Sequence, residues 1–275
     1  MKKMVETTQL SKSFAQVEAV KNVNLSIPEG QIFGLLGPNG AGKSTTIQML
    51  CTLLRPTSGK AEIAGFDTVR QGNEVRKKIG IIFQDSSLDE QLNAKENLEL
   101  HCMFYGVPLR EGREKIVRLL DMVELSAHQN RIVKTFSGGM KRRLEIARGL
   151  LHEPRLLFLD EPTVGLDPQT RKGIWSYIRN LKQTTGLTIF MTTHYLEEAE
   201  YCDNIMIMDH GQIIAEGSPE QLKQRVGRST VFIKTAHPER FAEHFRLHQE
   251  IVCKSTPEGL HFEVPEIESF LPLLI

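Results

Sequence analysis

The chain has 275 residues, among which 34 basic and 34 acidic side chains leave no net charge at pH 7. This length accommodates one large domain, alone or with a small appendage. The balanced charge excludes the excess positive field that drives binding to nucleic acid, so we expect no nucleic-acid partner, and four scattered cysteines without a Cys-x-x-Cys pair predict neither a disulfide framework nor a metal site.

A phosphate-binding motif follows the first predicted strands. Residues 4–33 predict short strands separated by turns, and the apolar run at 32–36 leads into GPNGAGKST at 37–45. This stretch contains the pattern Gly-x-x-x-x-Gly-Lys-Ser, and apolar residues at helical spacing follow it. A glycine-rich turn between a strand and a helix lets backbone N–H groups converge on one anion. The predicted nucleotide-binding residues of this loop are Gly37, Pro38, Asn39, Gly40, Ala41, Gly42, Lys43, Ser44 and Thr45.

Two side chains of this loop have distinct predicted roles. Backbone N–H groups of the loop and of the following helix would hold the α and β phosphates of a nucleotide. Lys43 is expected to span the β and γ phosphates, and the Ser44 hydroxyl is expected to ligate Mg²⁺. The loop therefore predicts a magnesium-dependent nucleoside triphosphate site.

Three further apolar runs predict strands, and two of them have the pattern of strands in a parallel sheet. The first run is IGIIFQ at 79–84, and the runs at 155–160 and 187–194 are nearly continuous, which is typical of strands buried on both faces. Residues 91–152 have a helical pattern, whereas residues 204–217 alternate around a turn and predict an antiparallel hairpin. These elements predict an α/β fold with a mainly parallel sheet.

An acidic pair, Asp160 and Glu161, ends the predicted strand at 155–160. A buried carboxylate is costly unless a cation or a donor pairs with it, and the carboxyl ends of parallel strands form the ligand crevice. We predict that Asp160 holds Mg²⁺, directly or through water, and that Glu161 activates the attacking water as general base. The alternative is that the pair caps the next helix.

A second glycine-rich segment, FSGGM at 136–140, starts another predicted helix. Ser137 is a candidate N-cap, and Gly138 and Gly139 expose backbone N–H groups beside it. A glycine-rich helix start is a second anion site. The basic run KRR at 141–143 is interpreted as a solvated face of this helix.

Taken in chain order, these motifs resemble those of the ATP-binding cassette (ABC) ATPases. The similar stretches are GPNGAGKST, Gln84 after a strand, the signature-like stretch FSGGM, LLFLDEP, VGLD at 164–167 and His194. The resemblance covers about residues 4–220 and implies a P-loop ATPase fold of ABC type, with a mainly parallel sheet core, an antiparallel β subdomain, a helical signature subdomain and a small C-terminal α+β appendage. We expect an ATP-binding domain over residues 1–222 and an accessory domain over 223–275, whose abrupt ending favours a truncated form.

The resemblance also implies a head-to-tail homodimer with two ATP molecules in its interface. Each ATP would lie between the phosphate loop of one subunit and Ser137, Gly138 and Gly139 of the other. Asp167 would reach across the interface, and Phe14 stands where the family has an aromatic ring stacked on adenine.

Two more site residues follow from the resemblance. Gln84 would contact Mg²⁺ and the attacking water and would sense a membrane partner. His194 would contact the γ-phosphate as a switch. With Glu161 these residues form the expected catalytic set, and the expected metal ligands are Ser44, Gln84 and Asp160.

Three stretches are most similar to the drug-resistance type of ABC-2 export ATPase, namely FSGGMKRRLEIARGL, DEPTVGLDPQTR and THYLEEAEYCD. Phe136, Met140 and Val164 depart from the residues of many family members but leave the catalytic set intact.

No stretch approaches the roughly 20 apolar residues of a membrane-spanning helix, so separate permease subunits would supply the span. We expect an ATP-hydrolysing export subunit at the cytoplasmic face of the cell membrane, docked through the surface at 84–98.

Three alternatives share parts of this chemistry. An ABC importer ATPase has the same catalytic residues, and only the signature region argues against it. A soluble ABC ATPase of DNA repair would place a long coiled coil between the phosphate loop and the signature, whereas residues 46–136 have no sustained heptads. A translation-associated ABC factor normally has two cassettes, and this chain has one phosphate loop.

Overall fold

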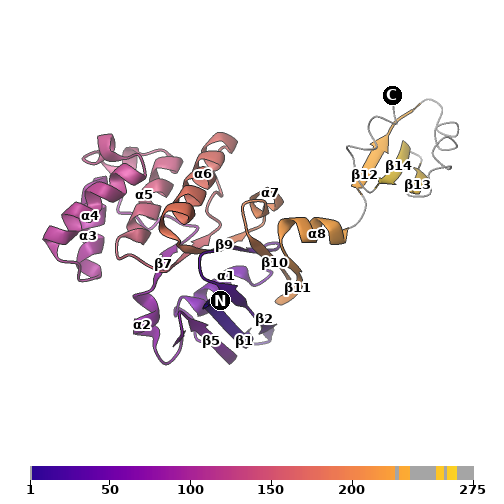
Figure 1. The fold of residues 1–275 in the computed structure, drawn as a ribbon, viewed down its shortest axis with the longest axis horizontal. Coiled ribbons are helices and arrows are strands. Elements are labelled where there is room, and N and C mark those ends of the chain that lie inside the picture. The colour runs from indigo at the N-terminus through magenta and orange to yellow at the C-terminus, as the bar shows by residue number, and fades with distance from the viewer. Residues whose placement is uncertain (1, 227–228, 236–251, 257–258, 265–275) are drawn as a thin grey trace. The chain divides into compact units, whose positions relative to one another are not determined.

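The computed structural model describes residues 2–226, 229–235, 252–256 and 259–264 (Figure 1). The chain divides into two compact units, Met1–Pro219 and Glu220–Ile275. The first unit carries all the motifs that are predicted to bind nucleotide.

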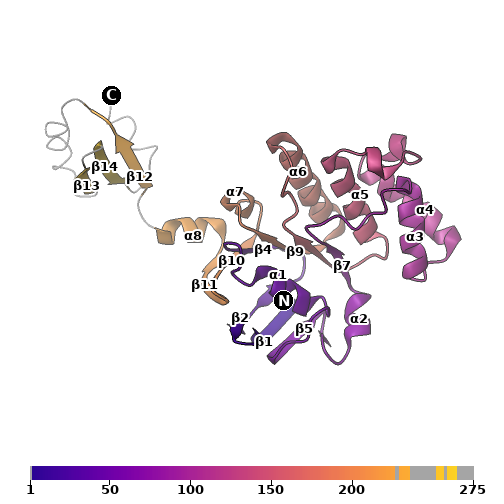
Figure 2. The ribbon, with the colours of Figure 1, turned by 180° about the vertical axis from the view of Figure 1, so that it is seen from behind.

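A six-stranded sheet forms the centre of the first unit (Figures 1 and 2). Its strand order is β11-β10-β4-β9-β8-β7, and neighbouring strands are parallel except β10 and β11, which form the predicted antiparallel hairpin. Every residue of β4, β8 and β9 is buried, as expected for strands covered on both faces. The predicted parallel strands are thus confirmed. The strands of this sheet are β4 (Ile32–Leu36), β7 (Ile79–Ile82), β8 (Leu156–Asp160), β9 (Thr188–Thr193), β10 (Asn204–Asp209) and β11 (Gln212–Gly217).

An antiparallel sheet shares a core with the central sheet, as the resemblance implied. β1 pairs with β2, β3 and β5, and β5 pairs with β6. Its elements, with the helix that packs against it, are β1 (Lys3–Phe14), β2 (Val17–Val23), β3 (Ser26–Pro28), β5 (Ser58–Ile63), β6 (Phe66–Asp67) and α1 (Lys43–Leu50). Ile47 of α1, Leu10 of β1 and Phe33 of β4 lie in one buried hydrophobic cluster. This cluster joins the two sheets around the helix that follows the phosphate loop.

A short helix precedes β7, helices occupy most of the chain between β7 and β8, and others follow β8 and β9 (Figures 1 and 2). They are α2 (Gly72–Arg76), α3 (Ala94–Phe104), α4 (Leu109–Met122), η1 (Ser126–His128), η2 (Val133–Thr135), α5 (Gly138–Leu150), α6 (Pro168–Thr185) and α7 (Leu196–Ala199). Asn93 and Glu96 form a capping box that starts α3. The Ser137 hydroxyl accepts a hydrogen bond from the N–H of Met140 at 3.3 Å and caps α5, as predicted.

The helix that follows the acidic pair is capped by a later residue. Oδ1 of Asp167 accepts hydrogen bonds from the N–H groups of Gln169 and Thr170 at 3.1 and 3.0 Å, and α6 starts there. The alternative that the acidic pair caps this helix is therefore wrong. Helix capping therefore does not explain the carboxylates of Asp160 and Glu161.

The second unit contains a three-stranded antiparallel sheet of order β12-β14-β13. Its elements are α8 (Pro219–Val226), which begins where the two units divide, β12 (Ser229–Ile233), β13 (Val252–Thr256) and β14 (Gly259–Val264). Leu260 and Phe262 of β14 are fully buried. The helix and strands of this unit match the small α+β appendage that the resemblance implied. Throughout the part of the chain that the structure describes, no helix has the length and apolar character needed to cross a membrane.

Candidate active site

Four predicted site groups converge at one edge of the central sheet. The phosphate loop follows β4, Gln84 comes shortly after β7, Glu161 follows β8 and His194 follows β9. Because these strands are parallel neighbours, their carboxyl ends share one edge. The four groups line one cavity of about 400 Å³. Its lining residues are Ala19, Asn39, Gly40, Gly42, Lys43, Ser44, Thr45, Gln84, Glu161, Val164, His194 and Tyr195.

Two glycines allow the path of the phosphate loop. Gly42, the N-cap residue of α1, has a φ of 108°, in a region that other residues rarely adopt. A Cβ atom at Gly42 would lie 2.4 Å from the carbonyl oxygen of Ala19, and one at Gly37 would lie 2.1 Å from that of Met208. Only glycine lets the loop run this close to β2 and β10.

The first turn of α1 presents backbone donors to the cavity. The helix starts without a side-chain cap, and its earliest backbone bond runs from the N–H of Thr46 to the carbonyl of Gly42 at 2.9 Å. Among the described residues, no acceptor contacts the N–H groups of Gly42, Lys43, Ser44 and Thr45. These groups stand at the positive end of the helix dipole and favour an anion.

Lys43 is a buried cation inside the loop. Its side chain is 5% exposed, and its ammonium donates to the carbonyl oxygens of Gly37 at 2.7 Å and Pro38 at 3.1 Å. The same Nζ lies 3.7 Å from Oε1 of Glu161. The loop carbonyls thus hold a positive charge between the loop and the acidic pair, where triphosphate recognition needs one.

Oxygen atoms beside the loop fit a magnesium ion. The Ser44 hydroxyl lies 3.4 Å from Oδ1 of Asp160, which also accepts a hydrogen bond from the Thr192 hydroxyl. Mg²⁺ is usually held by one or two protein oxygens together with phosphate oxygens and water. No cluster of three or more His, Cys, Asp or Glu side chains that could hold a metal occurs within the described ranges. The oxygens of Ser44 and Asp160 therefore suit a magnesium ion whose remaining ligands come from a nucleotide and water.

Glu161 is held in an unusual backbone conformation beside the cavity. Its φ of 47° lies in the left-handed region, which costs a non-glycine residue about 1–3 kcal/mol. Its N–H donates to the carbonyl and hydroxyl oxygens of Thr192 at 3.2 and 3.1 Å, and these bonds support the conformation. The carboxylate is 9% exposed, and its Oε1 lies 3.1 Å from Nδ1 of His194. A nearly buried carboxylate and an imidazole thus meet at the end of the sheet.

The signature residues and Asp167 do not line this cavity. Ser137 and Gly139 line a separate cavity of about 520 Å³ between α5 and α6. Asp167 is engaged in capping, and the hydrogen bond from the Thr170 hydroxyl holds the pKa of its carboxyl group below the usual value. The single chain does not bring these residues to the phosphate loop.

Phe14, the expected neighbour of adenine, also lies outside the cavity. It is the last residue of β1 and is 46% exposed. The ammonium of Lys12 lies 5.1 Å from the ring centroid, a cation–π contact. The ring is thus at the surface of the single chain.

The interpretation of 141–143 as a solvated helix face is wrong for Arg142. Its side chain is 7% exposed, and Glu145, with which it forms an ion pair of 2.9 Å, is 4% exposed. The guanidinium donates to backbone carbonyls at the ends of β7 and β8. A charge pair three residues apart is visible in sequence, but the buried face of the helix is not, so sequence reasoning missed this residue.

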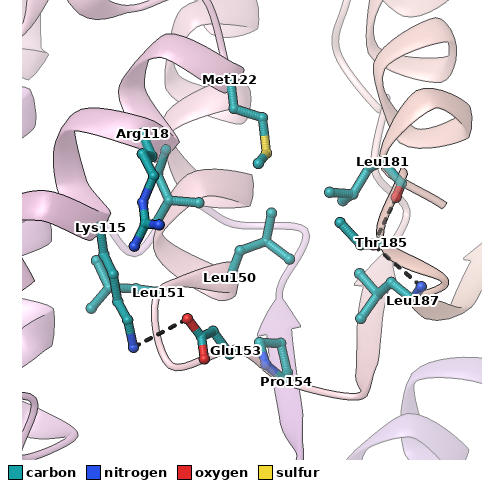
Figure 3. A pocket seen from close by; sticks show the side chains of 11 residues that line it. Lys115, Arg118, Met122, Leu150, Leu151, Glu153, Pro154, Leu181, Thr185 and Leu187 are labelled. Carbon is teal, nitrogen blue, oxygen red and sulfur yellow. Dashed lines mark hydrogen bonds and ion pairs between the residues drawn. The ribbon is translucent and has the colours of Figure 1, made fainter. Parts of the chain in front are cut away.

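A third cavity, of about 400 Å³, lies among α4, α6 and the end of α5 (Figure 3). Figure 3 shows apolar side chains such as Leu150 and Leu181 on its walls, and the ammonium of Lys115 lies 3.2 Å from Oε1 of Glu153 at its edge. None of the predicted site residues lines it. We therefore place the chemistry at the first cavity.

The glycine-rich loop before α1, the acidic pair at the end of β8 and the parallel sheet define a P-loop nucleoside triphosphatase. The family model for the ABC transporter matches residues 20–164. The chain belongs to this family and is an ATPase of it, which confirms the resemblance found in the sequence.

Several similar proteins are named as resistance ATP-binding proteins or as a probable multidrug ABC transporter ATP-binding protein. The chain is 42% identical over 244 residues to the daunorubicin/doxorubicin resistance ATP-binding protein DrrA of Streptomyces peucetius, covering 88% of this chain and 74% of that protein. It is 40% identical over 229 residues to the linearmycin resistance ATP-binding protein LnrL of Bacillus subtilis, covering 83% and 73%. The probable multidrug ABC transporter ATP-binding protein YbhF of Escherichia coli is 42% identical over 220 residues, which are 80% of this chain and 38% of YbhF. The similarity to the drug-resistance type is confirmed.

Solved structures confirm the fold class. CbiO1 from Clostridium perfringens, part of the ABC transporter complex cbiONQ, has a TM-score of 0.76 and 26% identity, covering 90% of this chain and 96% of that one. The ATP-binding cassette MJ0796, in a dimeric post-hydrolysis state bound to ADP and Pi, has a TM-score of 0.71 and 31% identity, covering 78% and 99%.

Proposed function

We propose that this chain is the ATP-hydrolysing subunit of an ABC-2 type exporter and works through separate permease subunits in the membrane. The names of three similar proteins, which refer to drug resistance or multidrug transport, support the export assignment. The chain would act at the cytoplasmic face of the membrane, where the permease holds it.

The observation that carries the hydrolysis mechanism is the convergence of four groups on one cavity. The N–H groups of the loop and the ammonium of Lys43 bind the phosphates of ATP. Ser44, Asp160 and Gln84 would hold Mg²⁺, which stabilises the charge on the transferred phosphoryl group. The buried position of Lys43 keeps its charge directed at the phosphates.

Glu161 is the proposed general base. Its carboxylate accepts a proton from a water molecule that Gln84 orients, and its low exposure limits competition from bulk water. His194 lies within hydrogen-bond distance of this carboxylate and restrains its position. The same ring is the proposed contact of the γ-phosphate.

A second copy of the chain completes the proposed site. Ser137, Gly138 and Gly139 start α5 away from the phosphate loop of their own chain, and their N–H groups suit an anion. We assign them to the ATP of the partner copy in a head-to-tail homodimer, with Asp167 at the interface and Phe14 against adenine. The dimeric state of the similar cassette MJ0796 supports this assembly.

The proposed permease contact is the segment 84–98, which leads from the cavity into α3. Met103 and Phe104, at the end of α3, are large apolar side chains that are 66% and 74% exposed. Clustered exposed apolar side chains favour a protein partner. A partner bound here would lie next to Gln84.

We also assign residues 1–222 to the ATP-binding domain and residues 223–275 to an accessory domain. The division of the compact units at Pro219 and Glu220 supports a boundary at α8.

The substitution Glu161→Gln tests the base assignment. An amide keeps the shape of the side chain but cannot take the proton, so we expect steady-state ATP turnover to fall by about 100- to 10,000-fold while ATP binding is preserved. Phosphate release measures turnover. Glu153→Gln is the matched control, because Glu153 also has a positive φ, 56°, but is 72% exposed and lies outside the cavity. Normal turnover in Glu161→Gln would contradict the assignment.

A further inference from the structure

One face of α5 holds the segment that follows β7. The ammonium of Lys141 lies 2.5 Å from Oε1 of Glu90, and the guanidinium of Arg148 donates to the carbonyl of Ser87 at 2.7 Å. Oε1 of Glu145 accepts a hydrogen bond from the N–H of Ser87 at 3.1 Å. Positions 141, 145 and 148 lie on one side of a helix. These contacts therefore hold α5, the helix that begins with the signature residues, against the segment that follows β7.

Arg142 joins this segment to the strand that ends in the acidic pair. Its Nη1 donates to the carbonyl of Phe83 at 2.7 Å, just after β7. Its Nε donates to the carbonyl of Pro162 at 2.7 Å. Its Nη2 donates to the carbonyls of Asp160 and Glu161 at 3.3 and 3.4 Å. The guanidinium thus spans the ends of β7 and β8.

The chemistry of this contact is specific for arginine. A guanidinium has five N–H donors in a planar fork, and those of Arg142 meet four backbone carbonyls and the carboxylate of Glu145. A lysine ammonium concentrates its donors at one point and cannot span both strand ends. Loss of only one member of the buried pair would leave an uncompensated charge.

We propose that Arg142 is a positioning residue. It fixes the positions of Gln84 and Glu161 relative to each other and to α5, the helix that begins with the signature residues. The segment after β7 carries the proposed permease contact. Because the guanidinium is bonded to this segment and to the end of β8, a displacement of the segment would also move the acidic pair. The inference rests on the proposed function, because that function assigns the catalytic roles of Gln84 and Glu161. Arg142 itself contacts backbone carbonyls and acts through them.

Substitutions in the full chain test the proposal by kinetics. In the double variant Arg142→Gln with Glu145→Gln, both buried charges are removed together, so the fold is kept while the fork is lost. We expect kcat for ATP hydrolysis to fall by about 10- to 100-fold, as for a small displacement of catalytic groups, with an unchanged Kd for ATP. Arg142→Lys, which keeps the charge, should recover part of kcat.

The neighbouring arginine supplies the matched control. Arg143 lies 3.0 Å from Glu124 and contacts the carbonyl of Val123, away from both strand ends. Arg143→Gln removes the same charge from the same helix, and we expect parental kcat. A kcat that falls equally in the control and in the double variant would overturn the proposal.

Amide hydrogen exchange of the same proteins provides a readout that does not depend on turnover. In the double variant, exchange should rise together in the segments 83–90 and 158–163, and in the control it should rise in neither. Increased exchange in only one segment, or parental kcat in a folded double variant, would overturn the coupling. Failure of the proposed function is distinguishable, since it would appear as normal turnover in Glu161→Gln whatever the exchange of the Arg142 variants.

Discussion

At the scale of one residue, the phosphate loop holds the positive charge of Lys43 in a fixed position. Two carbonyls of the loop hold its ammonium, and only 5% of the side chain is exposed. A hydrogen bond to a charged group contributes about 1.5–3 kcal/mol, so Lys43→Ala should raise the Kd for ATP by about ten- to hundredfold. Titration with a fluorescent ATP analogue in the presence of Mg²⁺ measures this. Lys77→Ala, in which a 66% exposed side chain is removed, is the control, and an equal Kd in both variants would exclude Lys43 from the site.

At the scale of elements, α3 packs against the turn after α5 through three rings. The Tyr105 and His152 rings stack with centroids 3.9 Å apart, and the His101 ring lies 4.7 Å from that of Tyr105. Burial is the main cause that lowers the pKa of His101 to about 4, and the electrostatic effects of the nearby Arg148 and His152 act in the same direction. Burial also lowers the pKa of His152. The His101 imidazole is therefore neutral in the folded protein near pH 7.

This packing predicts a loss of stability in acid. An unfolded histidine has a pKa of about 6.5, so between about pH 6.5 and about pH 4 the unfolded chain binds more protons than the folded chain. The contribution of His101 to stability is complete above this window and is lost as the pH falls through it. The urea midpoint, followed by the fluorescence of the single tryptophan, Trp175, should fall between pH 7 and pH 5, and it should fall less in His101→Gln.

The control for this prediction is an exposed histidine. His210 is 92% exposed, so His210→Gln should show the same fall in the urea midpoint as the parent protein. An equal fall in His101→Gln and in the parent would show that His101 does not contribute.

At the scale of the whole molecule, Ser137 and the phosphate loop line different cavities of one chain. In the proposed head-to-tail dimer, ATP would contact the phosphate loop of one copy and Ser137 of the other. We expect ATP and Mg²⁺ to convert Glu161→Gln from monomer to dimer in size-exclusion chromatography with light scattering. The added substitution Ser137→Arg should prevent dimerisation by blocking the interface. A Glu161→Gln protein that remains monomeric with saturating ATP would contradict the head-to-tail dimer.

The proposed contact with a permease also concerns the whole molecule. Purification of the native complex from membranes in mild detergent, followed by mass spectrometry, should recover a multi-span protein in stoichiometric amount. Asp85→Lys reverses an exposed charge in the proposed contact and should reduce the recovery, whereas Asp121→Lys reverses an exposed charge on α4 and should not. Recovery of ribosomes or nucleic acid instead would leave the ATPase chemistry intact but contradict the transport role.

The sequence by itself determined the features that neighbouring residues control. The phosphate loop could be predicted because its glycines, Lys43 and Ser44 are contiguous, and a turn of this kind depends on backbone conformations that glycine permits. The cap at Ser137 and the buried strand at 155–160 are likewise local patterns of capping and of continuous apolarity. Gln84 and His194 stood out only through resemblance to a family, since an isolated glutamine or histidine after a strand has no local signature.

Only the tertiary structure decided which distant residues meet. Gln84, Glu161 and His194 surround one cavity because β7, β8 and β9 are adjacent and parallel, and strand order is a property of the whole sheet. The burial of Arg142 depended on which face of α5 meets the strand ends, and a charge pattern is the same on a buried and on a solvated face. The separation of Ser137 from the phosphate loop was settled in the same way, because packing of α5 against its neighbours fixes where that helix begins.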